Sequence, residues 1–156
     1  MIWRKILKKR LMTILFYVYI VLLAYFLFFS EYLNRGQLAE EHQINTEIFR
    51  EIKRYCLHWR TVGLKNFMIN MPGNILAFAP FGFFLPYLKK EYRRFWIVAL
   101  MSFLFSQTIE VIQLVTKVGS FDVDDILLNT IGGMLGYLSY KIYLKFKNRK
   151  KKGSHG

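Results

Sequence analysis

The sequence predicts an all-α integral membrane protein with four transmembrane helices, cytoplasmic N- and C-termini and one amphipathic helix at the outer interface. Three observations predict this fold: four long apolar segments, short connections between all but the first two, and an uneven distribution of basic residues. Hydrophobic residues make up 54% of the 156 positions, and a soluble domain of this size would carry more charge and fewer aromatic residues.

The four apolar segments each approach the length that crosses a bilayer. They are roughly Leu11–Phe29, Met68–Leu88, Phe95–Val115 and Ile126–Leu144. A helix of about 20 apolar residues spans the hydrocarbon layer. The first segment has the basic start of a secretory signal, but it exceeds the usual core of about 7–15 residues, so we expect a retained anchor.

The net charge of +13 is divided unequally between the two sides that four spans define. Sixteen Lys and Arg residues and a single acid, Glu91, fall in the N-terminal, second connecting and C-terminal segments. The other side receives seven basic residues and the nine remaining acids. Because the basic side stays in the cytoplasm, both termini are predicted to lie there. Nucleic-acid binding, which such a charge favours in a soluble protein, is not expected.

The first connection, residues 30–67, is the long one, and we place it outside. Its front part, through Glu41, is polar and predicted to be loop. From Ile44 to Trp59 apolar residues recur at helical spacing, which predicts an amphipathic helix in the outer interface, capped by Asn45 or Thr46. This helix serves as an anchor or, alternatively, as a lid or partner surface.

The second span is predicted to be bent and covered by protein. It contains Pro72, Pro80 and Pro86, and each interior proline removes a backbone donor. Membrane helices tolerate this where neighbouring groups satisfy the freed carbonyls. Asn74 falls near the outer end of this span.

The third span carries a polar face. Ser102, Ser106 and Glu110 are spaced four residues apart, and Gln113 follows one turn later. Glu110 lies roughly 7–8 Å below the outer end at 1.5 Å rise per residue. An ionisable side chain in a membrane helix costs about 2.5–3.5 kcal/mol on insertion scales, so it is a candidate functional residue.

The outer turn leads into the fourth span through a group of acids. Asp122 as N-cap with Asp125 at the third helical position resembles a capping box. Asp122, Asp125 and Asn129 share one helix face. Behind them, Gly132 and Gly136 form a small-x-x-x-small surface that permits close helix packing.

Six polar residues from three spans therefore fall in the outer third of the membrane, and we predict that they form one polar pocket. They are Asn74, Glu110, Gln113, Asp122, Asp125 and Asn129. Two simpler interpretations stay open. The amides and acids could form a hydrogen-bonded network between helices, and capping alone could explain Asp122 and Asp125.

Two chemistries could use such acids. Paired carboxylates can act as general acid and base if their environments separate their pKa values. An oxygen-rich set could instead hold a hard cation beside a phosphate. Cys56 and the three histidines are scattered, so no His/Cys metal site and no cofactor is predicted. Without a nucleophile or phosphate-loop motif, no catalytic residue is assigned, and binding is at least as well supported as catalysis.

At these residues the chain resembles the VanZ-like family of bacterial membrane proteins over residues 67–144. The motifs are Asn74-Ile75-Leu76 with Phe78-x-Pro80-x-Gly82, Glu110-x-x-Gln113, and Phe121-Asp122-Val123-Asp124-Asp125-Ile126-x-x-Asn129-Thr130-x-Gly132-Gly133 with Gly136-Tyr137. Many members carry an Arg before the Phe-Asp pair, where this chain has Gly119-Ser120. The resemblance implies a multi-pass cell-envelope protein of the Gram-positive type, associated with low-level resistance to the lipoglycopeptide teicoplanin.

We therefore expect one VanZ-like membrane domain over residues 1–152 and a disordered tail over 153–156. The leading hypothesis is binding of a lipoglycopeptide or a cell-wall precursor lipid in the outward-facing pocket, with the lipid bilayer as the other partner. One alternative is a membrane-embedded enzyme that acts on a polyprenyl or cell-wall precursor lipid. The other is a small scaffold that works through the 44–59 helix.

Overall fold

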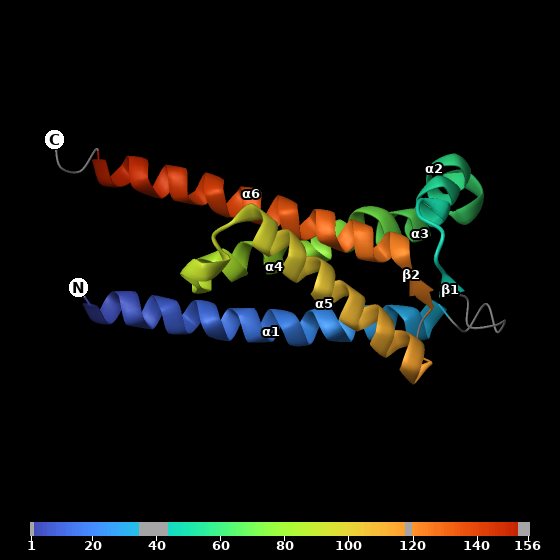
Figure 1. Cartoon of the computed structure of the whole chain (residues 1–156), viewed down its shortest axis with the longest axis horizontal. Coiled ribbons are helices and arrows are strands. Elements are labelled where there is room, and N and C mark those ends of the chain that lie inside the picture. The colour runs from blue at the N-terminus through green and yellow to red at the C-terminus, as the bar shows by residue number, and fades with distance from the viewer. Residues whose placement is uncertain (1, 35–43, 118–119, 153–156) are drawn as a thin grey trace.

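The chain folds into four long helices that run roughly along one axis, with two short strands and most of the short helices gathered at one end (Figure 1). This computed structural model describes residues 2–34, 44–117 and 120–152. The elements are α1 (Ile2–Asn34), β1 (Ile44–Asn45), α2 (Arg50–Val62), α3 (Leu64–Met68), the π-helical η2 (Ile69–Gly73), α4 (Asn74–Leu88), the 3-10 turn η3 (Lys90–Tyr92), α5 (Phe95–Thr116), β2 (Phe121–Asp122) and α6 (Val123–Lys152). The predicted tail and most of the predicted loop before residue 44 lie outside the described residues.

Three stretches of the described chain are long and apolar enough to cross a membrane. They are Ile6–Phe28 in α1, Leu64–Leu88 across α3, η2 and α4, and Phe95–Thr116 in α5. α6 contains the predicted fourth span but is not among the three. Glycine, asparagine and tyrosine residues in its central part lower its mean hydropathy. The helical fold is confirmed, while the fourth crossing stays a prediction.

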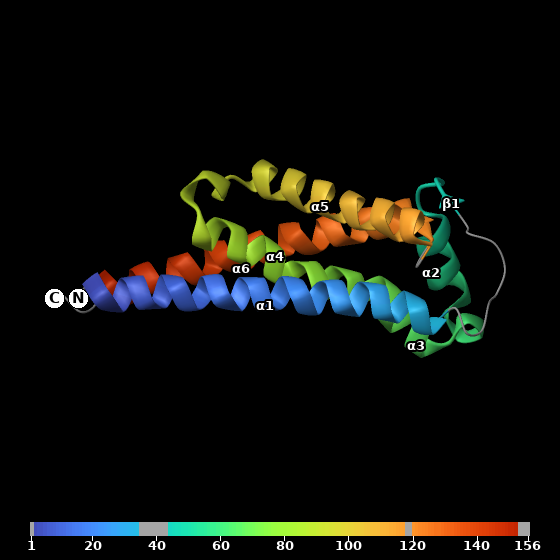
Figure 2. The same ribbon diagram turned by 90° about the horizontal axis from the view of Figure 1, so that it is seen from below.

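α6 lies between α4 and α5, and glycines allow the close approach (Figure 2). A Cβ added to Gly132 or Gly136 would overlap backbone atoms of α4, those of Ile75 and Ala79 respectively. A Cβ added to Gly133 would instead overlap the Ser102 side chain of α5. The small-residue surface predicted on this helix is therefore a packing surface, and it brings the polar faces of the three helices together.

α1 packs on the same bundle along one side only. Leu23 and Leu27 join Phe78 of α4 and Ile109 of α5 in a buried apolar cluster. The Tyr19 hydroxyl donates a 2.7 Å hydrogen bond to the Ala77 carbonyl. The outward side of α1 exposes many large apolar side chains, as expected of a surface that faces lipid rather than water.

The second span is irregular, since the π-helical segment η2 interrupts its α-helix. This segment contains Pro72 and passes directly into α4, which carries Pro80 and Pro86. Wide π-turns inside helices are frequent at functional sites. Here the segment ends at Gly73, directly before Asn74, one of the predicted site residues.

The boundaries predicted for the interfacial helix are wrong at its start. Ile44 and Asn45 form β1 and pair in parallel with Phe121 and Asp122 of β2. α2 begins only at Arg50, so neither Asn45 nor Thr46 caps it. The Asn45 side chain is used elsewhere, and an acid distant in sequence takes the capping position, as described below.

The start of α1, the α4–α5 connection and the end of α6 lie toward one end of the bundle (Figures 1 and 2). β1, β2 and α2 lie at the opposite end. The basic segments are thus separated from the acidic ones along the long axis, as the charge distribution predicts.

Candidate functional site

A small polar cavity lies at the end of the bundle that carries the two strands. Its polar lining residues are Asn70, Asn74, Glu110, Gln113, Asp125 and Asn129, and Phe26, Leu27 and Ile69 complete it. Its volume is about 20 Å³, enough for about one water-sized group. Five of the six residues predicted from the sequence line this cavity, and the sixth, Asp122, is bonded to Glu110.

Asn74 and Asp125 join α4 to α6 at the cavity wall. The Asn74 amide donates a 2.7 Å hydrogen bond to Oδ1 of Asp125. Asn74 is 7% exposed, so the bond is shielded from water. The position of Asn74 follows from η2, because this irregular turn ends where α4 begins.

Glu110 and Asp122 form the second connection, between α5 and the start of α6. Oε2 of Glu110 accepts a 2.9 Å hydrogen bond from the Asp122 backbone N–H. Oδ1 of Asp122 in turn accepts one from the Asp124 N–H at 2.8 Å, so Asp122 caps α6 as predicted. In a capping box the third helical residue returns a bond to the N-cap N–H. Glu110 takes that place, whereas the Asp125 side chain bonds Asn74.

Asn129 and Gln113 complete the polar lining. The Asn129 amide donates to the Ser106 hydroxyl at 2.8 Å, which pairs α6 with the polar face of α5. Its carbonyl oxygen, Oδ1, is buried and accepts no hydrogen bond from the described residues. The Gln113 amide donates to the Leu27 carbonyl of α1 at 3.5 Å. Asn129 Oδ1 is therefore an acceptor that a small donor in the cavity could use.

Asp124, which was not among the residues predicted from the sequence, holds the outer helix α2 in place. Its side chain is fully buried, and Oδ1 accepts from the Phe49 N–H at 2.6 Å. Oδ2 accepts from the N–H groups of Glu51 at 2.8 Å and Ile52 at 3.2 Å. The N–H groups at the start of a helix have no partner within the helix itself, and Asp124 supplies the acceptor here. Its negative charge is also favoured by the dipole of α2.

This contact also fixes an unusual backbone conformation. Phe49 precedes α2 with a φ of 68°, a left-handed conformation that a bulky residue seldom adopts. The short bond from its N–H to Asp124 holds it there. The missed signal was the count of acids in Asp122-Val123-Asp124-Asp125, since capping explains only some of them.

Asn45 links β1 to the same group of acids. Its amide donates to Oδ1 of Asp122 at 2.9 Å, and its own oxygen accepts from the Glu47 N–H at 3.1 Å. Asp122 thus receives donors from both β1 and α6. The two short strands and α2 are therefore attached to the start of α6 through Asp122 and Asp124.

Burial is the main influence on the pKa values of two acids at the strand end of the bundle. Burial raises the pKa of Asp122 above the usual Asp value, while hydrogen bonds from Asp124 and Asn45 oppose the rise. Burial also raises the pKa of Glu51, although Arg54 opposes it through a 2.7 Å ion pair. Both carboxyls are thus biased toward the protonated form.

The arrangement gathers carboxyl and amide groups from three helices around one cavity. Within residues 2–34, 44–117 and 120–152, no three His, Cys, Asp or Glu side chains are placed to hold one metal ion. Glu110 and Asp125 supply two carboxyl groups to one cavity, and Asn74, Gln113 and Asn129 supply amides. Such a lining can bind a small polar group by donating and accepting hydrogen bonds.

The fold and this site define a helical membrane protein with a buried polar cluster near one end of its bundle. The VanZ/LLP1 family model matches residues 16–144, which include every residue of the cavity, so the chain belongs to the VanZ/LLP1 family.

One similar protein is Protein VanZ from Enterococcus faecium. It is 35% identical over 103 residues, which cover 60% of this chain and 61% of that protein. The chain thus matches less than two thirds of the length of this relative. No solved structure matches it.

Proposed function

We propose that this VanZ/LLP1-family protein crosses the cell membrane four times and binds a lipid-linked or lipid-tailed ligand near the outer surface. Both termini lie in the cytoplasm, and α6 provides the fourth crossing. Through this binding the protein confers low-level resistance to teicoplanin-type lipoglycopeptides in a Gram-positive cell envelope. The shared family and the distribution of basic residues support this assignment.

The observation that carries the proposal is the convergence of polar side chains from α4, α5 and α6 on one cavity. Asn74, Glu110 and Asp125 come from three different helices. Polar groups within membrane helices are costly, so a cluster of them that includes two carboxyls is a candidate site rather than ordinary packing. Gln113 and Asn129 complete the lining, and Asp122 positions Glu110.

The size of the cavity restricts which part of a ligand can enter. A volume of about 20 Å³ admits a hydroxyl, amide or similar group, and the remainder of the ligand stays outside. Phe26 lines the cavity and is 42% exposed, so an acyl chain could lie against α1 beside it. A lipid-tailed molecule with a polar group near its head fits this arrangement.

The test is drug susceptibility of cells that express Glu110→Gln and Asp125→Asn variants. Each change keeps the side-chain shape and removes a carboxylate. We expect both variants to lose most of the resistance that the parent confers at equal protein level in the membrane. Glu47→Gln is the matched control, because it makes the same change at an exposed outer residue away from the cavity. Full resistance in both cavity variants would remove the binding site from consideration.

A second candidate is a membrane-embedded enzyme that acts on a polyprenyl or cell-wall precursor lipid. It is favoured by one observation: Glu110 and Asp125 line a cavity that has room for about one water. Two carboxyls in different surroundings can share acid and base roles. Purified protein would have to convert such a lipid, and loss of turnover in Glu110→Gln would support the enzyme hypothesis. Lack of turnover with any envelope lipid would leave binding.

A further inference from the structure

A second pocket lies at the opposite end of the bundle from the polar cavity, at the α4–α5 connection. Its volume is about 600 Å³, within the usual range of ligand sites. Four of its lining residues are basic, namely Lys9 of α1 and Lys89, Lys90 and Arg93 of the connection. We call this the basic groove. It shares no residue with the polar cavity, and only its assignment to the cytoplasmic leaflet rests on the membrane orientation proposed above.

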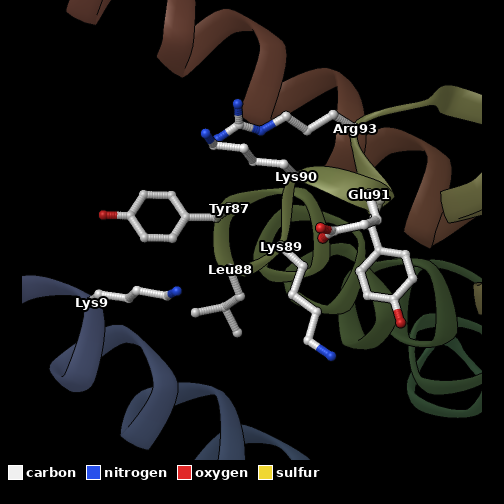
Figure 3. Close-up of a pocket in the computed structure, with 8 residues that line it drawn as sticks. Lys9, Tyr87, Leu88, Lys89, Lys90, Glu91 and Arg93 are labelled. Atoms are coloured by element: carbon white, nitrogen blue, oxygen red, sulfur yellow. The ribbon is translucent and has the colours of Figure 1, made fainter.

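The charges of the basic groove are in excess and largely uncompensated. Of the lining residues that the structure describes, Glu91 is the one acid, against four cations. Among the described residues, the ion pair that forms is that of Arg54 with Glu51, at the other end of the molecule. Figure 3 shows Lys90 and Arg93 extending in the same direction, while Lys9 extends from α1 toward Leu88. The groove thus presents cationic groups from two elements beside an aromatic and an apolar side chain.

The connection that carries these cations is attached to the helices around it. Nε of Arg93 donates to the Pro86 carbonyl at 3.3 Å, which directs the guanidinium. The Tyr137 hydroxyl of α6 donates to the Arg93 carbonyl at 2.8 Å. The Lys89 amine also lies over the Tyr92 ring, 5.9 Å from its centre. A positioned guanidinium is suited to phosphate recognition, because its donors match phosphate oxygens in pairs.

The position along the bundle indicates which phosphate compound is available. Trp96, two residues into α5, is 77% exposed, and exposed Trp at the end of a membrane helix marks the headgroup level. The groove lies just before it, where α4 ends at Leu88. At this level, the abundant anion is the phosphate of an anionic phospholipid.

We propose that the basic groove binds the headgroup phosphate of an anionic phospholipid in the cytoplasmic leaflet. Arg93 and Lys90 contact the phosphate oxygens, and Lys9 closes the groove from α1. Tyr87 and Leu88 lie against the glycerol and the upper acyl chain. The lipid bridges α1 and the α4–α5 connection. Without it, both segments pack mainly against α4.

The test is native mass spectrometry of the purified full chain, titrated in detergent with phosphatidylglycerol, with phosphatidylcholine or with soluble glycerol phosphate. The groove variant is Lys9→Gln with Lys90→Gln, both exposed residues whose removal leaves no packing defect. The matched control is Lys145→Gln with Arg149→Gln, which removes the same charge from exposed positions of α6 outside the groove. A second groove variant, Lys89→Gln with Lys90→Gln, leaves α1 unchanged and so keeps the test valid if the Lys9 replacement disturbs folding.

We expect the parent to prefer phosphatidylglycerol over phosphatidylcholine, and both groove variants to bind it at least about tenfold more weakly. Each basic residue near an anionic surface contributes roughly a fivefold increase in binding, so two account for this loss. The α6 control should stay within about twofold of the parent. Equal losses in the groove and control variants would overturn the proposal, as would equal binding of both lipids. Competition by glycerol phosphate at the lipid concentration would show a site for soluble anions and would also overturn it.

Discussion

The Asn74 amide donates a 2.7 Å hydrogen bond to Oδ1 of Asp125, so the first residue of α4 is bonded directly to the first turn of α6. Both residues line the polar cavity. The bond therefore does two things at once: it joins two helices and it orients a carboxyl group that the proposed ligand would meet. A measurement on this pair separates a structural role from a binding role.

We expect Asn74→Ala and Asp125→Ala to be coupled in a double-mutant cycle by about 1 kcal/mol. Hydrogen bonds between membrane helices average about 0.6 kcal/mol, and a carboxylate acceptor strengthens them. Equilibrium unfolding of the parent, the two single variants and the double variant in mixed micelles gives the coupling free energy. Strictly additive losses would mean that the two side chains do not interact in the folded protein.

Asp124→Ala should lower the free energy of unfolding by about 2 kcal/mol or more, because three backbone donors lose their acceptor. Hydrogen exchange should show the consequence locally. The amides of Phe49, Glu51 and Ile52 should lose protection, while amides in the middle of α5 stay protected. Unchanged exchange at these three amides would contradict the attachment of α2 to α6.

This attachment also bears on the scaffold hypothesis. Deleting α2 removes the Glu51 and Ile52 donors of the Asp124 carboxylate, so a deletion also disturbs the acids at the start of α6. Surface variants of α2, such as replacement of exposed Leu57 or Trp59, are the better test of a partner surface. Retained function in those variants would argue against a scaffold that works through this helix.

Gly82→Ala, Gly132→Ala and Gly136→Ala should each destabilise the bundle by about 3 kcal/mol or more. A Cβ at these positions would overlap main-chain atoms of the neighbouring helix. Overpacking a core usually costs about 1–3 kcal/mol, and we expect the upper end or more here because a main chain moves aside less easily than a side chain. Unfolding in denaturing micelles measures the loss. Ser139→Ala, at an exposed position of α6, should change stability by less than about 0.5 kcal/mol.

The raised pKa of Asp122 predicts a stability that falls as the pH rises. Burial is the main cause of the rise, so the pKa is higher in the folded than in the unfolded protein. Such a carboxyl stabilises the fold below the unfolded pKa, near 4, and this contribution is lost as pH rises through the folded pKa. The parent should therefore unfold more easily at neutral than at acidic pH.

Asp122→Asn should flatten this profile, because the replacement keeps an acceptor oxygen but does not titrate. Part of the slope should remain, since burial also raises the pKa of Glu51. The measurement is the free energy of unfolding at several pH values in both proteins. Parallel profiles for parent and variant would show that Asp122 is not the group responsible.

Cys56 gives a direct test of topology, since it is the chain's single cysteine and is exposed on α2. A membrane-impermeant maleimide should label it in intact cells if α2 lies outside. Lys90→Cys in a Cys56→Ser background should be labelled only after permeabilisation. The reverse pattern would invert the orientation and place the polar cavity toward the cytoplasm.

The parts of the fold that were predictable are those with a signal in a continuous stretch of sequence. Apolar length located the helices, and prolines located the irregular second span. Alternation of the spans then placed the ends of α4, α5 and α6 together, which is why Asn74, Glu110 and Asp125 could be grouped by their positions along the chain. The packing role of the α6 glycines followed from their spacing in the same way.

What escaped prediction depends on contacts between residues far apart in sequence. Helix caps are sought within a few residues of a helix start, whereas α2 is capped by Asp124 from another helix. The capping-box assignment of Asp125 failed for the same reason, since Glu110 of α5 supplies the bond to the Asp122 N–H. Strands of two residues such as β1 carry no period at all.

The direct contact of the α4 and α6 main chains has a consequence for how a ligand reaches the cavity. At the glycines the two main chains already touch, so we do not expect these helices to separate there. The pair forms the stationary frame of the molecule. We therefore expect a ligand to enter by displacement of α1, which has few contacts with the bundle, or of α2, which Asp124 attaches to α6.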